Sequence, residues 1–281
     1  MTPHRGTLFP HFPLGLGSVP LPEWVVLVVP LTTPVAAAAG VEGHHMIDGF
    51  AARFASDGGR TATFLIDPTR RKKDLDAALA FGVHLILRRE GRLDLHAAAV
   101  APRPDAGGLL IIGPKGTGKS SLTMALALRG WTFYSDDHLI TWREAGELRV
   151  AGLRVPLFLT PDAAERLPAH LPKGQEVPSL GKRMFKPDEL FPGQHRAGGQ
   201  IAATVFPEFA SAATSTLEPL RPLDCFQRLL AVSPFLVADP SARPCIEVAR
   251  AIADLPAFVL RASPDLLEPR FADELLRTAL G

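Results

Sequence analysis

Residues 109–120 read LLIIGPKGTGKS, a short apolar run followed directly by a glycine-rich loop. The loop, residues 113–120, matches the pattern G-x-x-x-x-G-K-[ST] completely. In loops of this pattern, backbone amides surround nucleotide phosphates, the lysine reaches the β- and γ-phosphates, and the final hydroxyl holds Mg²⁺. The sequence therefore predicts a phosphate-binding loop. The predicted nucleotide-binding residues are those of the loop and the residue that follows it: Gly113, Pro114, Lys115, Gly116, Thr117, Gly118, Lys119, Ser120 and Ser121.

The segments on either side of the loop support this interpretation. Residues 109–112 are apolar, as in a buried strand, and residues 121–129 are good helix formers that end before Gly130. A strand–loop–helix order directs the positive end of the helix dipole at a bound anion. A match by chance in a glycine-rich turn lacks this context.

The amino-acid composition narrows the possible classes of protein. The chain has 281 residues, 47% of them hydrophobic and 21% charged, which fits one large or two small globular domains. A net charge of +1 offers no case for a nucleic-acid or membrane partner. The apolar stretch 24–39 is interrupted by Pro30 and Pro34, so we expect a strand plus loop there and not a membrane span or signal peptide. Cys225 and Cys245 indicate two buried thiols in a reducing cytoplasm.

The pattern of the chain predicts a mixed α/β protein. We expect an N-terminal portion over residues 1–82, irregular over 1–20, and a catalytic domain over residues 83–281. Residues 154–200 are rich in proline and predict long binding loops or a lid. A hairpin is predicted from residues 138–142 on. The other expected strands are 61–66, 83–87, 95–100, 131–135, 201–206 and 257–261, and the expected helices are 70–81, 121–129, 223–232, 246–254 and 267–280.

Two adjacent carboxylates, Asp136 and Asp137, follow the strand after the loop helix. Only 16 residues separate Lys119 from Asp136, so the chain runs out along a helix and returns along a strand. This return can bring both carboxylates beside the γ-phosphate. Phosphoryl transfer needs groups that neutralise phosphate charge and a carboxylate that orients or deprotonates the attacking hydroxyl. The competing interpretation is a solvated pair in a turn, where aspartate is common.

His96 begins the strand before the one that leads into the loop. If these two strands are neighbours, His96 lies near the loop and can contact a phosphate or an aspartate. A lone histidine on an apolar strand is more often structural, so the residue pattern by itself leaves its role open.

These residues together resemble a known family. LHAAAV at 95–100 and GLLIIGPKGTGKSSLTMALALRGWTFYSDD at 108–137 resemble the catalytic domain of HPr kinase/phosphorylase, and more closely the bacterial HPr-kinase-related serine kinases. Weaker similarity continues to residue 281, including TVFPEF at 204–209. The resemblance implies a P-loop fold like that of phosphoenolpyruvate carboxykinase, with a mixed-sheet core.

The resemblance also implies an activity. It implies a cytoplasmic, ATP- and Mg²⁺-dependent kinase acting on a serine of a peptide or small protein, and it makes a homo-oligomer an expectation. It assigns catalysis to His96, Lys119 and Asp136, with Asp136 as the base, and metal binding to Ser120 and Asp137; the two aspartates could exchange roles. A Glu-Arg-Gly signature expected downstream is absent, and GELRVAGLRVPL at 146–157 is the nearest segment. This departure argues against HPr as substrate and against a phosphorylase reaction.

Two other functions fit the same motifs. The first is a small-molecule P-loop kinase of the shikimate or gluconate type, although such chains usually begin at the loop. The second is a non-catalytic ATP-binding regulatory protein, against which the intact Lys119, Ser120 and aspartate pair argue. Lys182, Arg183 and Lys186 could grip a phosphate or an acidic peptide, or only solvate the surface.

Overall fold

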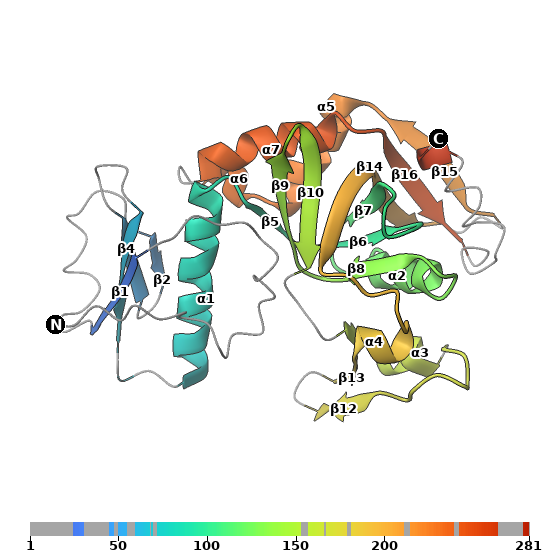
Figure 1. Ribbon diagram of the computed structural model, residues 1–281, viewed down its shortest axis with the longest axis horizontal. Coiled ribbons are helices and arrows are strands. Elements are labelled where there is room, and N and C mark those ends of the chain that lie inside the picture. Colours follow the sequence, from blue (N-terminus) through green and yellow to red (C-terminus); the bar gives the residue numbers. More distant parts are fainter. Residues whose placement is uncertain are drawn as a thin grey trace. The chain divides into compact units, whose positions relative to one another are not determined.

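A computed structural model describes most of the chain as two compact units, one ending at Glu90 and the other beginning at Gly91 (Figure 1). Each unit is described by itself. The described residues are 25–30, 45–47, 50–54, 60–67, 69, 72–152, 157–165, 167–178, 181–210, 214–238, 242–263 and 278–280. Two expectations lie outside these residues: the irregular segment 1–20 and the loop over 31–39. The helix expected over 267–280 also lies outside them, except for its last residues.

The first unit is a four-stranded sheet with one helix, α1 (Lys72–Arg89). The strand order is β1-β4-β3-β2, with β1 and β4 parallel and the other pairs antiparallel. Alternate residues of β4, namely Ala62, Phe64 and Ile66, are buried, as expected for a sheet with one covered face. They pack against α1. The strands are β1 (Val25–Pro30), β2 (His45–Ile47), β3 (Phe50–Phe54) and β4 (Thr61–Ile66).

The strand predicted over 83–87 is wrong, because these residues form the second half of α1. A short apolar run does not by itself distinguish a buried strand from a buried helix. Gly82 lies within α1 and serves close packing. A Cβ added at Gly82 would lie 2.5 Å from the ring of Phe64, so its missing side chain lets the helix approach β4.

The second unit is built on a nine-stranded mixed sheet. The strand order is β5-β9-β10-β14-β7-β6-β8, and β16 pairs with β14 and β15. β14 runs parallel to β7 and β16, and the other pairs are antiparallel. The strands are β5 (Leu93–Leu95), β6 (Ala97–Ala101), β7 (Gly108–Ile112), β8 (Thr132–Ser135), β9 (Leu139–Glu144), β10 (Glu147–Gly152), β14 (Gly198–Phe209), β15 (Thr216–Leu220) and β16 (Ala257–Ala262).

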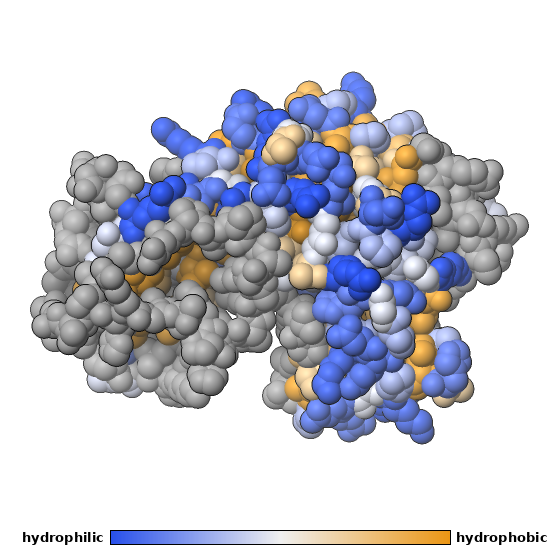
Figure 2. All heavy atoms as spheres, viewed as in Figure 1, coloured by the Kyte–Doolittle hydropathy of each residue, from blue (hydrophilic) through white to orange (hydrophobic). Residues whose placement is uncertain are grey.

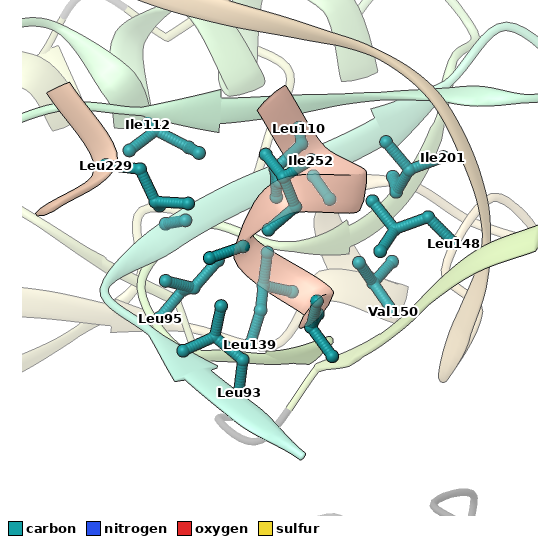
Figure 3. Close-up of a cluster of buried hydrophobic side chains, with 14 of the residues drawn as sticks. Leu93, Leu95, Leu110, Ile112, Leu139, Leu148, Val150, Ile201, Leu229 and Ile252 are labelled. Atoms are coloured by element: carbon teal, nitrogen blue, oxygen red, sulfur yellow. The ribbon is translucent and has the colours of Figure 1, made fainter. Parts of the chain in front are cut away.

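Helices cover both faces of this sheet. Leu109 and Ile111 of β7 pack with α2 (Lys119–Ala127), whereas Leu110 and Ile112 face the other way. That second face is covered by α5 (Pro222–Val232), α6 (Phe235–Ala238) and α7 (Arg243–Ala253). Figure 3 shows Leu229 of α5 and Ile252 of α7 among the strand side chains of this core. β7 is therefore buried on both faces, as its apolar sequence predicts.

Most predicted elements of the second unit are confirmed within a few residues. The 95–100 strand is broken, however, since His96 separates β5 from β6. β14 was expected to end before Pro207 but continues to Phe209. Its pairing with β7 ends at Val205, and a proline without an N–H is tolerated where a strand edge needs no donor. Cys225 and Cys245 are buried as predicted, and burial raises the pKa of the Cys225 thiol to about 12.

The region predicted as long loops carries a small sheet of its own. Strand β13 (Lys182–Phe185) pairs with β11 (Leu157–Leu159) and β12 (Gln175–Val177), and the helices α3 (Pro161–Glu165) and α4 (Pro187–Leu190) belong to the same region. Its apolar side chains form a cluster with Met124 and Ala127 of α2. Strands of three or four residues are too short to show an alternating hydrophobic pattern. The many prolines of this region also favoured its interpretation as loops. Hydrophilic side chains predominate over this region in Figure 2.

Among the described residues, no helix combines the length and apolar character needed to cross a bilayer.

One prediction concerns Tyr134 of β8, which is 1% exposed and whose hydroxyl has no hydrogen-bond partner among the described residues. Burial raises the pKa of this hydroxyl. A buried polar group without a partner costs about 1–3 kcal/mol, so Tyr134→Phe should leave the free energy of unfolding unchanged or raise it by about 1 kcal/mol. Gly199→Ala, whose Cβ would collide with the same hydroxyl, should lower it. Urea unfolding measures both, and a loss above 1 kcal/mol in Tyr134→Phe contradicts the assignment.

Candidate functional site

The glycine-rich loop lies where the sequence placed it, between β7 and α2. Gly116 and Gly118 have φ angles of 90° and 95°, which side-chain-bearing residues rarely adopt. Gly118 is the N-cap of α2, and no side chain in the described part of the chain caps this helix end. Backbone amides at the helix start are therefore available to an anion.

Lys119 folds back over the loop that precedes it. Its side chain is buried, and Nζ donates to the carbonyl oxygens of Gly113 at 2.7 Å and Pro114 at 3.1 Å. Burial lowers the pKa of Lys119, while the charges of Asp137 and Asp136, in that order, raise it. The net direction of the pKa of Lys119 is downward, although both carboxylates favour its charged form.

Sheet topology explains why these groups converge. β6 lies between β7 and β8 and is antiparallel to both, so β7 and β8 end at the same edge of the sheet, where β6 begins. The loop follows β7, the aspartate pair follows β8, and His96 directly precedes β6. β6 and β7 are neighbours, so the condition under which His96 was expected to lie near the loop is met.

At this edge Asp137 contacts two histidines. Its Oδ1 lies 2.8 Å from Nδ1 of His96, and its Oδ2 lies 3.8 Å from Nε2 of His138. The two imidazole rings meet edge to face, with centroids 5.3 Å apart. Asp137 and both histidines are partly exposed, whereas Asp136 is 5% exposed. The two neighbouring carboxylates thus have different surroundings: one faces histidines and solvent, the other is enclosed.

The segment 194–196 holds the other edge of β8. Phe133 donates its amide to the carbonyl of Gln194 at 3.0 Å and accepts from the amide of Arg196 at 3.0 Å. β8 is thereby fixed between β6 on one side and this segment, which follows α4, on the other. The position of the aspartate pair depends on both contacts.

One residue of this site was missed in the sequence. His138 was treated only as the start of a strand, although a histidine directly after two aspartates was a usable signal. The cations considered for substrate contact have neighbours elsewhere: Arg183 lies 3.5 Å from Glu176, and Lys186 lies 3.0 Å from Glu189. Lys182 lies on β13.

No protein-family model matches the chain, and no curated protein matches it. Among solved structures it is similar to the HPr(Ser) kinase/phosphatase from Coxiella burnetii, with 15% sequence identity and a TM-score of 0.38. The match covers 66% of this chain and 88% of that one. A TM-score this low does not establish a shared fold. What is established is a mixed α/β unit with a mixed sheet, and the resemblance seen in the sequence stays a prediction.

The loop geometry predicts a measurable coupling between Gly113 and Thr117. A Cβ added at Gly113 would lie 2.7 Å from Oγ1 of Thr117, which itself donates to the carbonyl of Pro114 at 3.0 Å. Gly113→Ala should therefore lower the free energy of unfolding by about 1–3 kcal/mol through overpacking. Thr117→Ala removes the colliding oxygen, so the double variant should lose less than the sum of the single losses, by about 1 kcal/mol. Strictly additive losses in urea unfolding would contradict this geometry.

Proposed function

We propose that this chain is a Mg²⁺- and ATP-dependent kinase that phosphorylates a serine of a peptide or small protein. The observation that supports this most is Lys119, a buried ammonium group held against the glycine-rich loop and acted on by two carboxylates. A cation beside a phosphate-binding loop, with carboxylates beside it, is the arrangement that phosphoryl transfer requires.

The loop would bind the nucleotide phosphates. The backbone amides of residues 115–121 would donate to phosphate oxygens at the start of α2. Phosphate oxygens would replace the carbonyls of Gly113 and Pro114 as acceptors for Lys119 Nζ. Charge-assisted hydrogen bonds of this kind are stronger than those to a neutral carbonyl, which favours the exchange.

The oxygen donors near Lys119 suit Mg²⁺, which prefers hydroxyl, carboxylate and phosphate ligands. Ser120, next to Lys119 at the start of α2, and Asp137 would hold this ion. When bound, Mg²⁺ supplies charge neutralisation on the β- and γ-phosphates. His96 would act as a positioning residue, since it holds the Asp137 carboxylate at 2.8 Å.

Asp136 would take the proton of the acceptor serine. The serine oxygen bonds to the γ-phosphorus, the bond from that phosphorus to the β-phosphate oxygen breaks, ADP leaves, and the hydroxyl proton passes to Asp136. Because Asp136 is 5% exposed, water competes little for it, and the acceptor hydroxyl must arrive as a bound group. Lys119 would stabilise the charge that develops on the transferred phosphoryl group.

Lys119→Ala should abolish transfer. Removing one group that stabilises transition-state charge lowers kcat by about 10²–10³-fold, and Lys119 also contacts the phosphates. The assay is phosphate transfer from labelled ATP to a library of serine peptides, with nucleotide binding followed by a fluorescent ATP analogue. Lys173→Ala, an exposed lysine of the small sheet region, is the matched control and should behave as the native protein. Transfer by Lys119→Ala at the native rate would exclude the proposal.

Asp136→Asn separates catalysis from binding. The amide keeps the size of the side chain but cannot accept the proton, so kcat should fall about 10²–10⁴-fold while the ATP analogue still binds. Asp105→Asn, on an exposed loop, is the control. If Asp136→Asn leaves transfer unchanged, Asp136 is not the base. Labelled phosphate appearing on hydroxyl metabolites and not on peptides would instead favour a small-molecule kinase.

A further inference from the structure

We infer that His96, Asp137 and His138 form a binding site for a divalent first-row transition-metal ion of the Zn²⁺ or Co²⁺ kind. The three side chains offer two imidazole nitrogens and one carboxylate oxygen, and their ligand atoms all lie within 4.8 Å of one another. The inference goes beyond the proposed function: it assigns these three residues to a second ion, distinct from the Mg²⁺ that Ser120 and Asp137 would hold with the nucleotide.

The distances suit a shared ion. Two ligand atoms that bind one ion at about 2.1 Å lie about 3 Å apart, depending on the angle between the bonds. Nδ1 of His96 lies 2.8 Å from one oxygen of Asp137, and Nε2 of His138 lies 3.8 Å from the other. The edge-to-face arrangement keeps the two rings from stacking, with a centroid separation of 5.3 Å. The three ligand atoms are thus already close to the spacing that one shared ion requires.

The types of ligand atom favour one class of metal ion over another. Mg²⁺ prefers oxygen ligands and is bound reluctantly by imidazole, whereas imidazole suits Zn²⁺, Co²⁺ and related ions. Two histidines and one carboxylate, with a fourth position left open, form a recurring catalytic site for Zn²⁺. The carboxylate of Asp137 compensates part of the ion's charge, and Asp136 lies next to it in the chain.

The place of the three residues in the fold supports binding. His96 lies between β5 and β6, and the other two ligands lie between β8 and β9, so adjoining strands fix both segments. The side chains of both histidines are 44% exposed and that of Asp137 is 22% exposed, so an ion can reach them from solvent.

The test is direct metal binding by the full chain without nucleotide. Co²⁺ titration should give a visible absorption band that saturates at one ion per chain, and calorimetry should show Zn²⁺ binding that excess Mg²⁺ does not displace. His96→Gln and His138→Gln should each weaken Co²⁺ binding at least about 100-fold, since loss of a group that merely orients a ligand costs about 10–100-fold. His170→Gln, an exposed histidine outside the site, should bind Co²⁺ as the native chain does.

Circular dichroism of each variant in chelator checks that the fold is kept. Lys119→Ala should retain Co²⁺ binding. If the native chain binds Co²⁺ in this way but transfers no phosphate, the proposed function alone is removed. The metal inference is overturned if Co²⁺ gives no saturable band, if His138→Gln binds as tightly as the native chain, or if Mg²⁺ competes at equal concentration. In those cases the three side chains only hydrogen-bond among themselves.

Discussion

Strand β7 is enclosed on every side, and the rest of the second unit is arranged around it. It is paired with β14 along one edge and β6 along the other, and all five of its residues are buried. A slip in its register would break both ladders and move every buried side chain to the opposite face. Its carboxyl end is therefore a fixed point, and the glycine-rich loop starts there.

The same enclosure imposes an electrostatic constraint on the site. Lys119 is only 6% exposed, and burial of its ammonium group is unfavourable unless hydrogen bonds and opposite charges compensate it. The carbonyls of Gly113 and Pro114 and the two aspartates supply this compensation. The groups that stabilise the buried lysine thus include the two aspartates, which the proposed phosphoryl transfer would also use.

The parts of this arrangement that the sequence predicted are those with a strong local pattern. The apolar run of β7, the loop and α2 could be read directly, because each has its own signature within a few residues. The contact between His96 and Asp137 depends on β6 separating β7 from β8, a long-range pairing that local pattern does not contain. The second half of α1 and the three short strands β11, β12 and β13 were missed, since an apolar run or a three-residue strand lacks a decisive period. The contact between the His138 and His96 rings also depends on two separate segments meeting, although the position of His138 directly after the aspartate pair was a usable signal.

The two hydrogen bonds between Phe133 and the segment 194–196 connect the small sheet region to the aspartate pair. β11, β13 and α4 contribute side chains to the same apolar cluster as Phe133, so β8 is joined to this region by packing as well. A displacement of the small sheet region is therefore transmitted to β8. A molecule that bound the β11–β13–β12 sheet and shifted residues 194–196 would also have to displace β8 or break those bonds, so the small sheet is mechanically connected to the strand that carries the two aspartates.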